Sequence, residues 1–330
     1  MKIHFELHIH VHKDQPTPKT VERPSIMNHD QSFVEIATSA AKKVQRSHRI
    51  NTYNNYMTAM RSFLKYLGED IPVRDIQGHT LEGYERWLKD TSISLNTISC
   101  YMRSLRSILN QSGIFELDYI HQLFKNVFTG TTKTEKRAIT DDDIMRLVDV
   151  EVQKGSFEEL TRDVFLFSFY AMGMPFVDVA FLRKEQIQDG KIYYYRHKTG
   201  QRICICLEPC MQDIIRKYQS TQSDYVFPII ENTHQHQATN EYLNQLGKYN
   251  RTLKRLALRA GIKTKLTSYV VRHTWASLAY QSNVELPVIS KALGHTNTET
   301  TMVYIKEIDD QRLQKANRQL IQKTMRKKEV

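Results

Sequence analysis

The feature that most constrains the fold is the spacing of apolar residues between positions 31 and 111. These residues recur every three or four positions. This spacing places them along one side of amphipathic helices. One apolar stripe follows Asn96 and comprises Ile98, Tyr101, Met102, Leu105, Ile108 and Leu109; another, within 51–67, comprises Tyr53, Tyr56, Met57, Met60, Phe63, Leu64 and Leu67. A third helical segment is expected at 81–87. Since such stripes need partners to cover them, the sequence predicts a small helical domain.

A polar segment without periodicity lies between Phe128 and Arg137 and marks a domain boundary. Beyond it, Thr140 followed by Asp143 is typical of a capped helix start. Upstream, three prolines between residues 14 and 24 indicate a linker after an alternating strand at 3–11. We therefore expect a short N-terminal strand and linker at 1–30, a helical domain at 31–128 and a second domain at 129–330.

The second domain changes its periodicity between residues 190 and 207. Ile192 and Tyr194 alternate with polar residues before a gap, and apolar residues alternate again from Ile203 to Leu207. The turn between them contains Lys198, so the pattern predicts a β-hairpin with a lysine near its tip. A lysine at an exposed turn is common, and by itself this one indicates no function. The expected fold is mainly α-helical with a small hairpin or sheet.

Charge and composition narrow the function. Among 330 residues the net charge is +11, which attracts polyanions and makes nucleic acid the first partner to consider, although a solvated lysine-rich surface is the simpler alternative. The longest apolar run, 164–177, is shorter than the roughly 20 residues of a membrane span. No signal peptide opens the chain, and its four cysteines form no CxxC pair. These features predict a cytoplasmic protein without membrane association.

Three segments near the C-terminus carry the specific signal. They are Arg-His-Thr-Trp-Ala at 272–276, Ala-Leu-Gly-His at 292–295 and Thr-Thr-Met-Val-Tyr at 300–304. Each is weak alone, but their order and spacing resemble the catalytic end of tyrosine recombinases of the phage-integrase family, in its mobile-element branch. With the hairpin lysine and the helical domain, the resemblance covers residues 31 to about 325.

The resemblance implies a helical, SAM-like core-binding domain at 31–128 and a tyrosine-recombinase catalytic domain with a tail helix at 129–330. It implies a site-specific recombinase or integrase that cleaves and rejoins duplex DNA through a 3′-phosphotyrosyl intermediate. In this scheme Tyr304 attacks the scissile phosphate, and Lys198 protonates the departing 5′-oxygen. The enzyme would need no metal or other cofactor, would act as a tetramer on DNA and could use DNA-bending accessory proteins.

The chemistry of a phosphodiester explains these residue types, because its charged oxygens must be met by fixed donors before a nucleophile can attack. Arg272 can offer a planar fork to those oxygens, and His295 can donate a hydrogen bond or move a proton. The hydroxyl of Tyr304, whose ordinary pKa is about 10, needs cations or a base nearby. Each residue also has a purely structural alternative: Tyr304 as a core tyrosine, His295 as a residue after a helix-ending Gly294, and Arg272 as a surface arginine. These alternatives are plausible for each residue singly and much less so for all three together.

Two positions depart from the family pattern. Tyr269 occupies the place of a histidine three residues before Arg272, and a tyrosine hydroxyl can likewise donate to a phosphate oxygen. The family's first arginine is expected in the turn that leads to Asp178, where this chain has Met172 and Pro175.

Loss of that arginine leaves two possibilities. Another cation, Arg183 or Arg162, replaces it, or the protein is slow or inactive. One preorganised donor to a transition-state charge is worth on the order of 10²- to 10³-fold in rate.

Further DNA contacts are expected from polar residues of the helical domain. The candidates are Thr52, Asn55, Arg61, Asn96, Thr97 and Arg103. Contacts to phosphates should dominate, and an ordinary solvated helix face is the alternative for each.

The tail at 309–328 carries an apolar stripe that would dock on a neighbouring protomer or on its own domain.

Two rival functions remain open. The absent first arginine favours a DNA-binding regulator that has lost catalysis. His4, His8, His10 and His12 share one side of the N-terminal strand and could hold zinc or copper, although a polar strand face is the simpler interpretation and we predict no metal site. The C-terminal motifs rank integrase-like activity first.

Overall fold

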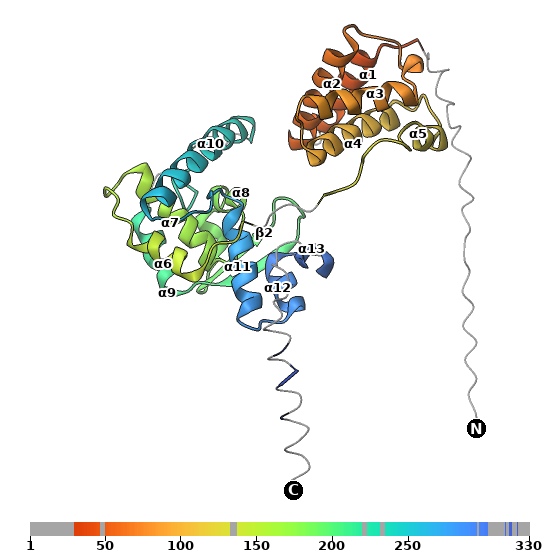
Figure 1. Ribbon diagram of the computed structural model, residues 1–330. Coiled ribbons are helices and arrows are strands. Elements are labelled where there is room, and N and C mark those ends of the chain that lie inside the picture. Colours follow the sequence, from red (N-terminus) through yellow and green to blue (C-terminus); the bar gives the residue numbers. More distant parts are fainter. Residues whose placement is uncertain are drawn as a thin grey trace, which may run out of the picture. The chain divides into compact units, whose positions relative to one another are not determined.

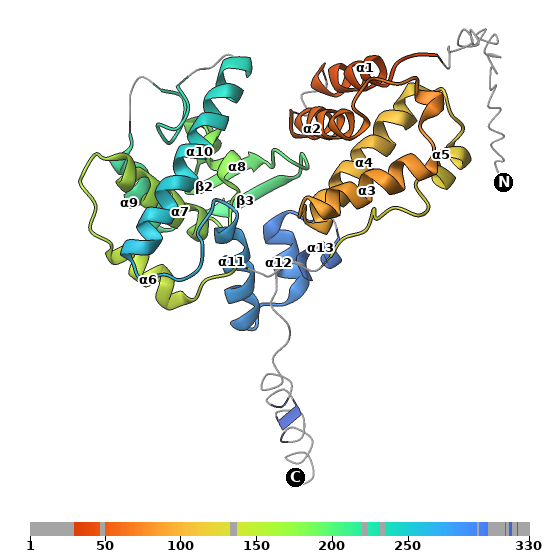
Figure 2. The same ribbon diagram turned by 45° about the horizontal axis from the view of Figure 1, so that its top comes forward.

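The computed structural model describes residues 30–46, 50–132, 137–219, 223–231, 235–295 and 297–302, together with single residues at 314, 317, 318 and 322. The chain divides into two compact units, Met1–Thr134 and Glu135–Val330, and Figures 1 and 2 show the elements of each. Tyr304, the predicted N-terminal strand and linker, and nearly all of the predicted tail helix lie outside the described residues.

The first unit is built from helices, and the apolar residues of the two predicted stripes lie in its core or pack against it. Its helices are α1 (Phe33–Arg46), α2 (Ile50–Leu67), the 3₁₀ helix η1 (Val73–Asp75), α3 (Gly78–Asp90), α4 (Leu95–Ser112) and α5 (Leu117–Leu123) (Figure 1). The hydroxyl of Ser94 caps the start of α4 by accepting from the backbone of Thr97, and Gly113 ends it in the left-handed conformation. The predicted helices are thus confirmed, and α3 extends beyond the predicted 81–87.

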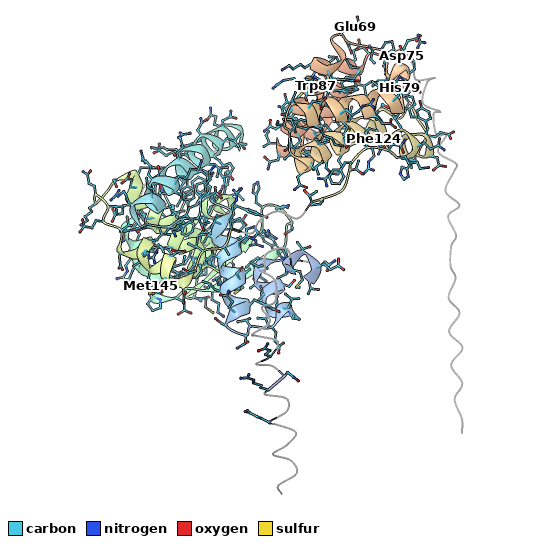
Figure 3. The ribbon with its side chains drawn as sticks, viewed as in Figure 1. Glu69, Asp75, His79, Trp87, Phe124 and Met145 are labelled. Carbon is cyan, nitrogen blue, oxygen red and sulfur yellow. The ribbon has the colours of Figure 1, made fainter. Side chains whose placement is uncertain are left out.

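Aromatic rings fill the core of this unit. Phe63 contacts Phe33 and Tyr84, with ring centroids 5.2 Å and 5.0 Å apart, and all three side chains are fully buried. Trp87 on α3, labelled in Figure 3, also belongs to this group, and its ring stacks against that of Tyr84. Since aromatic side chains bury large apolar areas, these contacts fix how α1, α2 and α3 pack.

The second unit surrounds the long apolar helix α7 (Phe157–Tyr170), which packs against helices on several sides. Its other helices are α6 (Asp141–Asp149), α8 (Phe176–Ala180), η2 (Lys184–Gln186), α9 (Pro209–Lys217), α10 (Gln235–Arg259), α11 (Val270–Gln281), α12 (Leu286–Leu293) and α13 (Thr298–Met302) (Figure 1). The predicted cap at Thr140 and Asp143 begins α6 as a reciprocal capping box. Met145 lies on the exposed face of α6 (Figure 3).

The only strands among the described residues form one antiparallel sheet in the order β1 (Ile187–Gln188), β2 (Lys191–Tyr195), β3 (Arg202–Cys206). Figure 2 shows β2 and β3 as a hairpin. Ile192 pairs with Ile205 and Tyr194 with Ile203, and these four side chains are buried. The predicted hairpin and the mainly helical fold class are confirmed, whereas β1, only two residues long, is too short to show any periodicity. Over the described ranges, no helix combines the length and apolar character needed to cross a membrane.

Candidate active site

Arg272, near the start of α11, has three acceptors that fix its guanidinium. Only 3% of the residue is exposed. Its Nη1 donates to the carbonyl of Gly173 at 3.1 Å, and its Nη2 donates to the carbonyl of Leu293 and to Nε2 of His295, the latter at 3.2 Å. A buried arginine with such contacts is held in one orientation, which preorganises its fork for an anion.

Gly173 allows the turn after α7 to lie directly on Arg272. Its φ is +70°, and a Cβ at this position would lie 3.0 Å from the Cα of Arg272. A side chain here would push the turn away and break the bond from Nη1. The turn in which the family's first arginine is expected therefore touches Arg272 through its backbone.

His295 follows α12 and adopts a tautomer that its partners define. Because a guanidinium can only donate, Nε2 of His295 accepts from Arg272. The proton then resides on Nδ1, which donates to the hydroxyl of Thr301 at 2.8 Å, and Thr301 is fully buried. Burial, followed by the charges of Arg272, Arg196 and Lys198, lowers the pKa of His295 to about 4. The imidazole is therefore neutral at pH 7.

The tip of the β2–β3 hairpin brings two more cations to this site. Arg196 is buried, with 6% exposed, and its Nη1 donates to the carbonyl of Gly294 at 2.9 Å. Lys198 lies exposed in the turn, and its charge acts on His295. The backbone N–H of His197, between them, donates to Oδ1 of buried Asp178 at 2.9 Å. Asp178 thereby ties the hairpin tip to α8.

Burial raises the pKa of Asp178 above its ordinary value, and the bond from His197 and the charges of Arg196, His197 and Arg272 oppose this rise. Arg196 was not among the predicted site residues. Its signal in the sequence is that Ile192, Tyr194 and Arg196 continue one alternating strand face, so an arginine occupies a position where the pattern calls for an apolar side chain.

The structure brings Arg272 and His295 into contact and places the charge of Lys198 near them. Tyr269 is the residue before α11, three positions ahead of Arg272; it is 57% exposed, and its ring packs against His273 with centroids 4.8 Å apart. Tyr304 follows α13, outside the described residues. Its catalytic role, and the roles of the other four residues, stay predictions.

The predicted DNA contacts of the helical unit differ in their surroundings. Asn55 and Arg61 on α2 and Arg103 on α4 are exposed, whereas Thr52 is half-buried. Asn96 uses its amide oxygen and nitrogen on the backbone of Thr132, at 2.9 Å and 3.1 Å. The hydroxyl of Thr97 bonds to that of Ser94 at 2.9 Å. Asn96 therefore holds the chain beyond α5, and the exposed residues are the better candidates for phosphate contacts.

Replacing Gly294 with alanine should destabilise the second unit by about 1–3 kcal/mol beyond the strain of its backbone. Gly294 ends α12 with φ +63°, and an added Cβ would lie 2.7 Å from Cδ1 of Ile203 and 3.3 Å from Cδ of Arg196. Gly200→Ala is the matched control, because Gly200 has φ +66° and no atom within 4 Å of such a Cβ. Urea unfolding of both variants would measure the difference, and equal losses would contradict the tight packing at Gly294.

Acid should remove a stabilising contribution from His295. Its folded pKa of about 4 lies below its ordinary 6.5, so the unfolded chain binds the proton first as the pH falls. The free energy of unfolding should therefore decline from about pH 6.5 to about pH 4. Urea unfolding of the parent and of His295→Gln across this range would test it. The stability difference between the two proteins should shift with pH, and parallel profiles would count against a depressed pKa.

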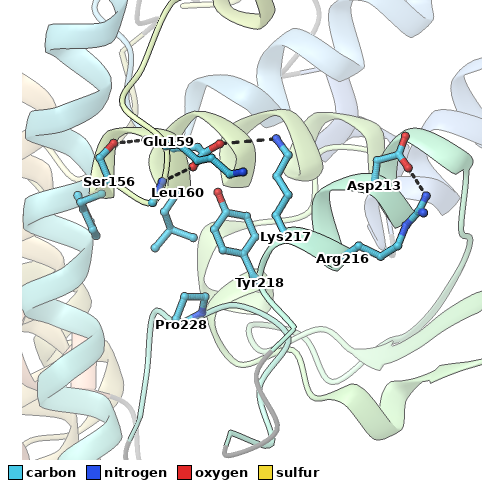
Figure 4. A pocket seen from close by; sticks show the side chains of 11 residues that line it. Ser156, Glu159, Leu160, Asp213, Arg216, Lys217, Tyr218 and Pro228 are labelled. Carbon is cyan, nitrogen blue, oxygen red and sulfur yellow. Dashed lines mark hydrogen bonds and ion pairs between the residues drawn. The ribbon is translucent and has the colours of Figure 1, made fainter.

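A hollow of about 860 Å³ lies elsewhere in the unit, between α7 and α9 (Figure 4). Two of its cations have acidic partners: Arg216 pairs with Asp213, and Lys217 pairs with Glu159 and, at 2.8 Å, with Asp163. Since the charges of Arg216 and Lys217 are compensated, the hollow is a poorer phosphate site than the cluster around Arg272.

No group of three or more His, Cys, Asp or Glu side chains among the described residues could hold a metal ion. The four N-terminal histidines lie outside those residues.

Comparison with known proteins gives matches over both units. Residues 137–311 match the phage integrase family, and residues 32–122 match the phage integrase SAM-like domain. A tyrosine recombinase of Thermosipho africanus is 23% identical over 274 residues, which cover 81% of this chain and 92% of that protein.

Two solved structures share the fold at low sequence identity. A lambda integrase (75–356) dimer bound to a COC′ core site has a TM-score of 0.64 and 16% identity, covering 83% of this chain and 95% of that one. A lambda integrase tetramer bound to a Holliday junction has a TM-score of 0.62 and 14% identity, covering 86% of this chain and 79% of that one.

Proposed function

The chain belongs to the phage integrase family, and we propose that it is a tyrosine-type site-specific recombinase that cleaves and rejoins duplex DNA. The observation that carries this proposal is the cluster of Arg272 and neutral His295, in contact with each other and close to the charge of Lys198. Such a cluster can hold a phosphodiester and move a proton beside it.

In the proposed reaction the phenolic oxygen of Tyr304 attacks the scissile phosphorus, and the bond from phosphorus to the 5′-oxygen breaks. The phenol loses its proton, which Nε2 of His295 can accept once Nη2 of Arg272 donates to the phosphate instead of to this nitrogen, and Lys198 gives a proton to the departing 5′-oxygen. The products are a 3′-phosphotyrosyl link and a free 5′-hydroxyl. Protons and charge balance, and the ester bond is kept for rejoining, so the cycle needs no cofactor.

Arg272 contributes by meeting the charge that develops on the non-bridging oxygens. The carbonyls of Gly173 and Leu293 already hold its guanidinium in one orientation, so the side chain needs little reorganisation when a phosphate binds. Tyr269, exposed at the start of α11, adds a hydroxyl donor to the same anion.

Duplex DNA is the proposed partner of both units, with Asn55, Arg61 and Arg103 contacting phosphates from the helical unit. The net charge of +11 supports this. The similar lambda integrase forms a dimer on a core site and a tetramer on a Holliday junction, and we propose that several copies of this chain likewise assemble on DNA. The tetrameric state, DNA-bending accessory proteins and a cytoplasmic location stay predictions.

The function can be tested with nicked duplexes taken from the DNA that flanks the gene. A nick just 3′ of the scissile phosphate lets the short cleaved fragment diffuse away, so the covalent complex accumulates. The expected product is an SDS-resistant adduct that retains a label placed 5′ of the break. An adduct that instead retains a label placed 3′ of the break would contradict a 3′-phosphotyrosyl link. Tight binding without any adduct would favour a DNA-binding protein without catalysis.

A further inference from the structure

The charge of the transition state exceeds what Arg272 alone can meet. Attack on a phosphodiester produces a five-coordinate phosphorus whose non-bridging oxygens carry about two negative charges, against one in the substrate. The turn before Asp178 carries Met172 and Pro175 where the family has its first arginine. Another fixed cation is therefore needed within reach of Arg272.

Arg196 is a buried cation whose bonding is incomplete. Its Nη1 donates to the carbonyl of Gly294, while its Nε is buried and has no hydrogen-bond partner among the described residues. Across the same residues, no carboxylate oxygen lies within 4.0 Å of its guanidinium. The buried carboxylate of Asp178 acts on Arg196 only through its charge, without an ion pair within 4.0 Å. Because a buried guanidinium N–H without a partner is costly, an anion that completes its bonding would stabilise the site.

Arg196 and Arg272 meet at one place, the end of α12. Arg196 donates to the carbonyl of Gly294, and Arg272 donates to the adjacent carbonyl of Leu293. His295, the next residue, contacts Arg272, and both arginine charges lower its pKa. Two buried guanidiniums bound to consecutive carbonyls repel each other, and a phosphate bound to both would relieve that repulsion.

The other two arginines considered from the sequence are engaged elsewhere. Arg162 donates to Oδ1 of Asp163 at 3.1 Å and to the carbonyl of Val150 at 2.9 Å. Arg183 lies over the ring of Tyr225 and within 3.8 Å of Glu185. Both guanidiniums thus have a carboxylate within 4.0 Å, whereas the printed bond of Arg196 goes to the carbonyl of Gly294.

We propose that Arg196 is a catalytic residue that contacts the scissile phosphate as the second guanidinium, in place of the arginine absent from the turn before Asp178. This inference rests on the proposed function. It gives the hairpin tip two tasks, since Arg196 meets the non-bridging charge while Lys198, two residues on, protonates the leaving oxygen. Asp178 positions both by accepting from the intervening N–H of His197.

The test compares Arg196→Ala and Arg196→Lys with the parent on two nicked duplexes. One carries the normal scissile phosphate, and the other carries a methylphosphonate, in which a neutral methyl replaces a charged oxygen. On the phosphate, adduct formation by Arg196→Ala should fall by about 10²- to 10³-fold, with a smaller loss for Arg196→Lys, which keeps the charge but loses the fork. On the methylphosphonate the deficit of Arg196→Ala should shrink to tenfold or less, since one negative charge fewer must be met.

Arg216→Ala is the control, because Arg216 is an exposed arginine of the same unit, 66% exposed and paired with Asp213. It should behave like the parent on both duplexes. Thermal unfolding of each variant separates folding from chemistry, and Arg196→Lys decides the result if Arg196→Ala does not fold. An equal deficit on both duplexes would make Arg196 a structural residue and overturn the proposal, as would an Arg196→Ala protein as active as the parent. A parent without adduct on any flanking duplex would instead overturn the proposed function itself.

Discussion

Replacing Tyr304 with phenylalanine should abolish the covalent adduct with nicked DNA while leaving DNA affinity within about twofold of the parent. The substitution removes one oxygen, the proposed nucleophile, and phenylalanine keeps the ring, so packing and net charge hardly change. Without the hydroxyl no ester to the 3′-phosphate can form. Denaturing gels would measure the adduct, and a mobility-shift titration at fixed salt would measure the affinity.

Tyr119→Phe is the matched control for this experiment, because Tyr119 is a partly exposed tyrosine on α5 in the other unit. It should form the adduct at the parental rate. An adduct that persists in Tyr304→Phe would assign the nucleophile to another residue. Loss of DNA binding together with the adduct would instead indicate that residue 304 matters for the structure.

Periodicity was sufficient to predict most of the fold because the elements concerned are long or half-buried. The stripes of α2 and α4 and the alternation of β2 and β3 each span enough residues to reveal their period. The strand β1 has two residues, and its pairing with β2 depends on the tertiary structure. No local pattern could therefore have predicted it.

The candidate site was predictable only where a motif marks it. Arg272 and His295 stand in segments of specific spacing, and the structure brings them into contact. Arg196 stands in no such segment, and its proximity to them depends on Gly294, whose missing side chain lets the hairpin approach α12. Asn96 shows what a sequence pattern leaves out, since a polar residue near a helix start gives no sign that its side-chain amide bonds to the backbone of Thr132.

Arg272→Ala should reduce the rate of adduct formation by at least about 10³-fold, since it removes two preorganised donors from the phosphate. Arg272→Lys tests the geometry apart from the charge. Its donors all leave one nitrogen and cannot reproduce the planar fork that spans the carbonyls of Gly173 and Leu293, so its rate should fall at least about 10²-fold, between alanine and the parent. Rates would come from time courses on the nicked duplex at saturating protein.

In these variants the free energy of unfolding should respond differently from the rate of adduct formation. The contrast separates the structural role of Arg272, which is bonding to two carbonyls, from its proposed role in binding the phosphate. Alanine leaves two buried carbonyls without this donor, which costs about 1–3 kcal/mol for each group left unpaired. It also relieves the repulsion between the guanidiniums of Arg272 and Arg196, so the net loss measured in urea should be smaller than that sum. If Arg272→Lys kept the parental rate, positive charge alone would suffice at this position, and the planar fork would have no catalytic role.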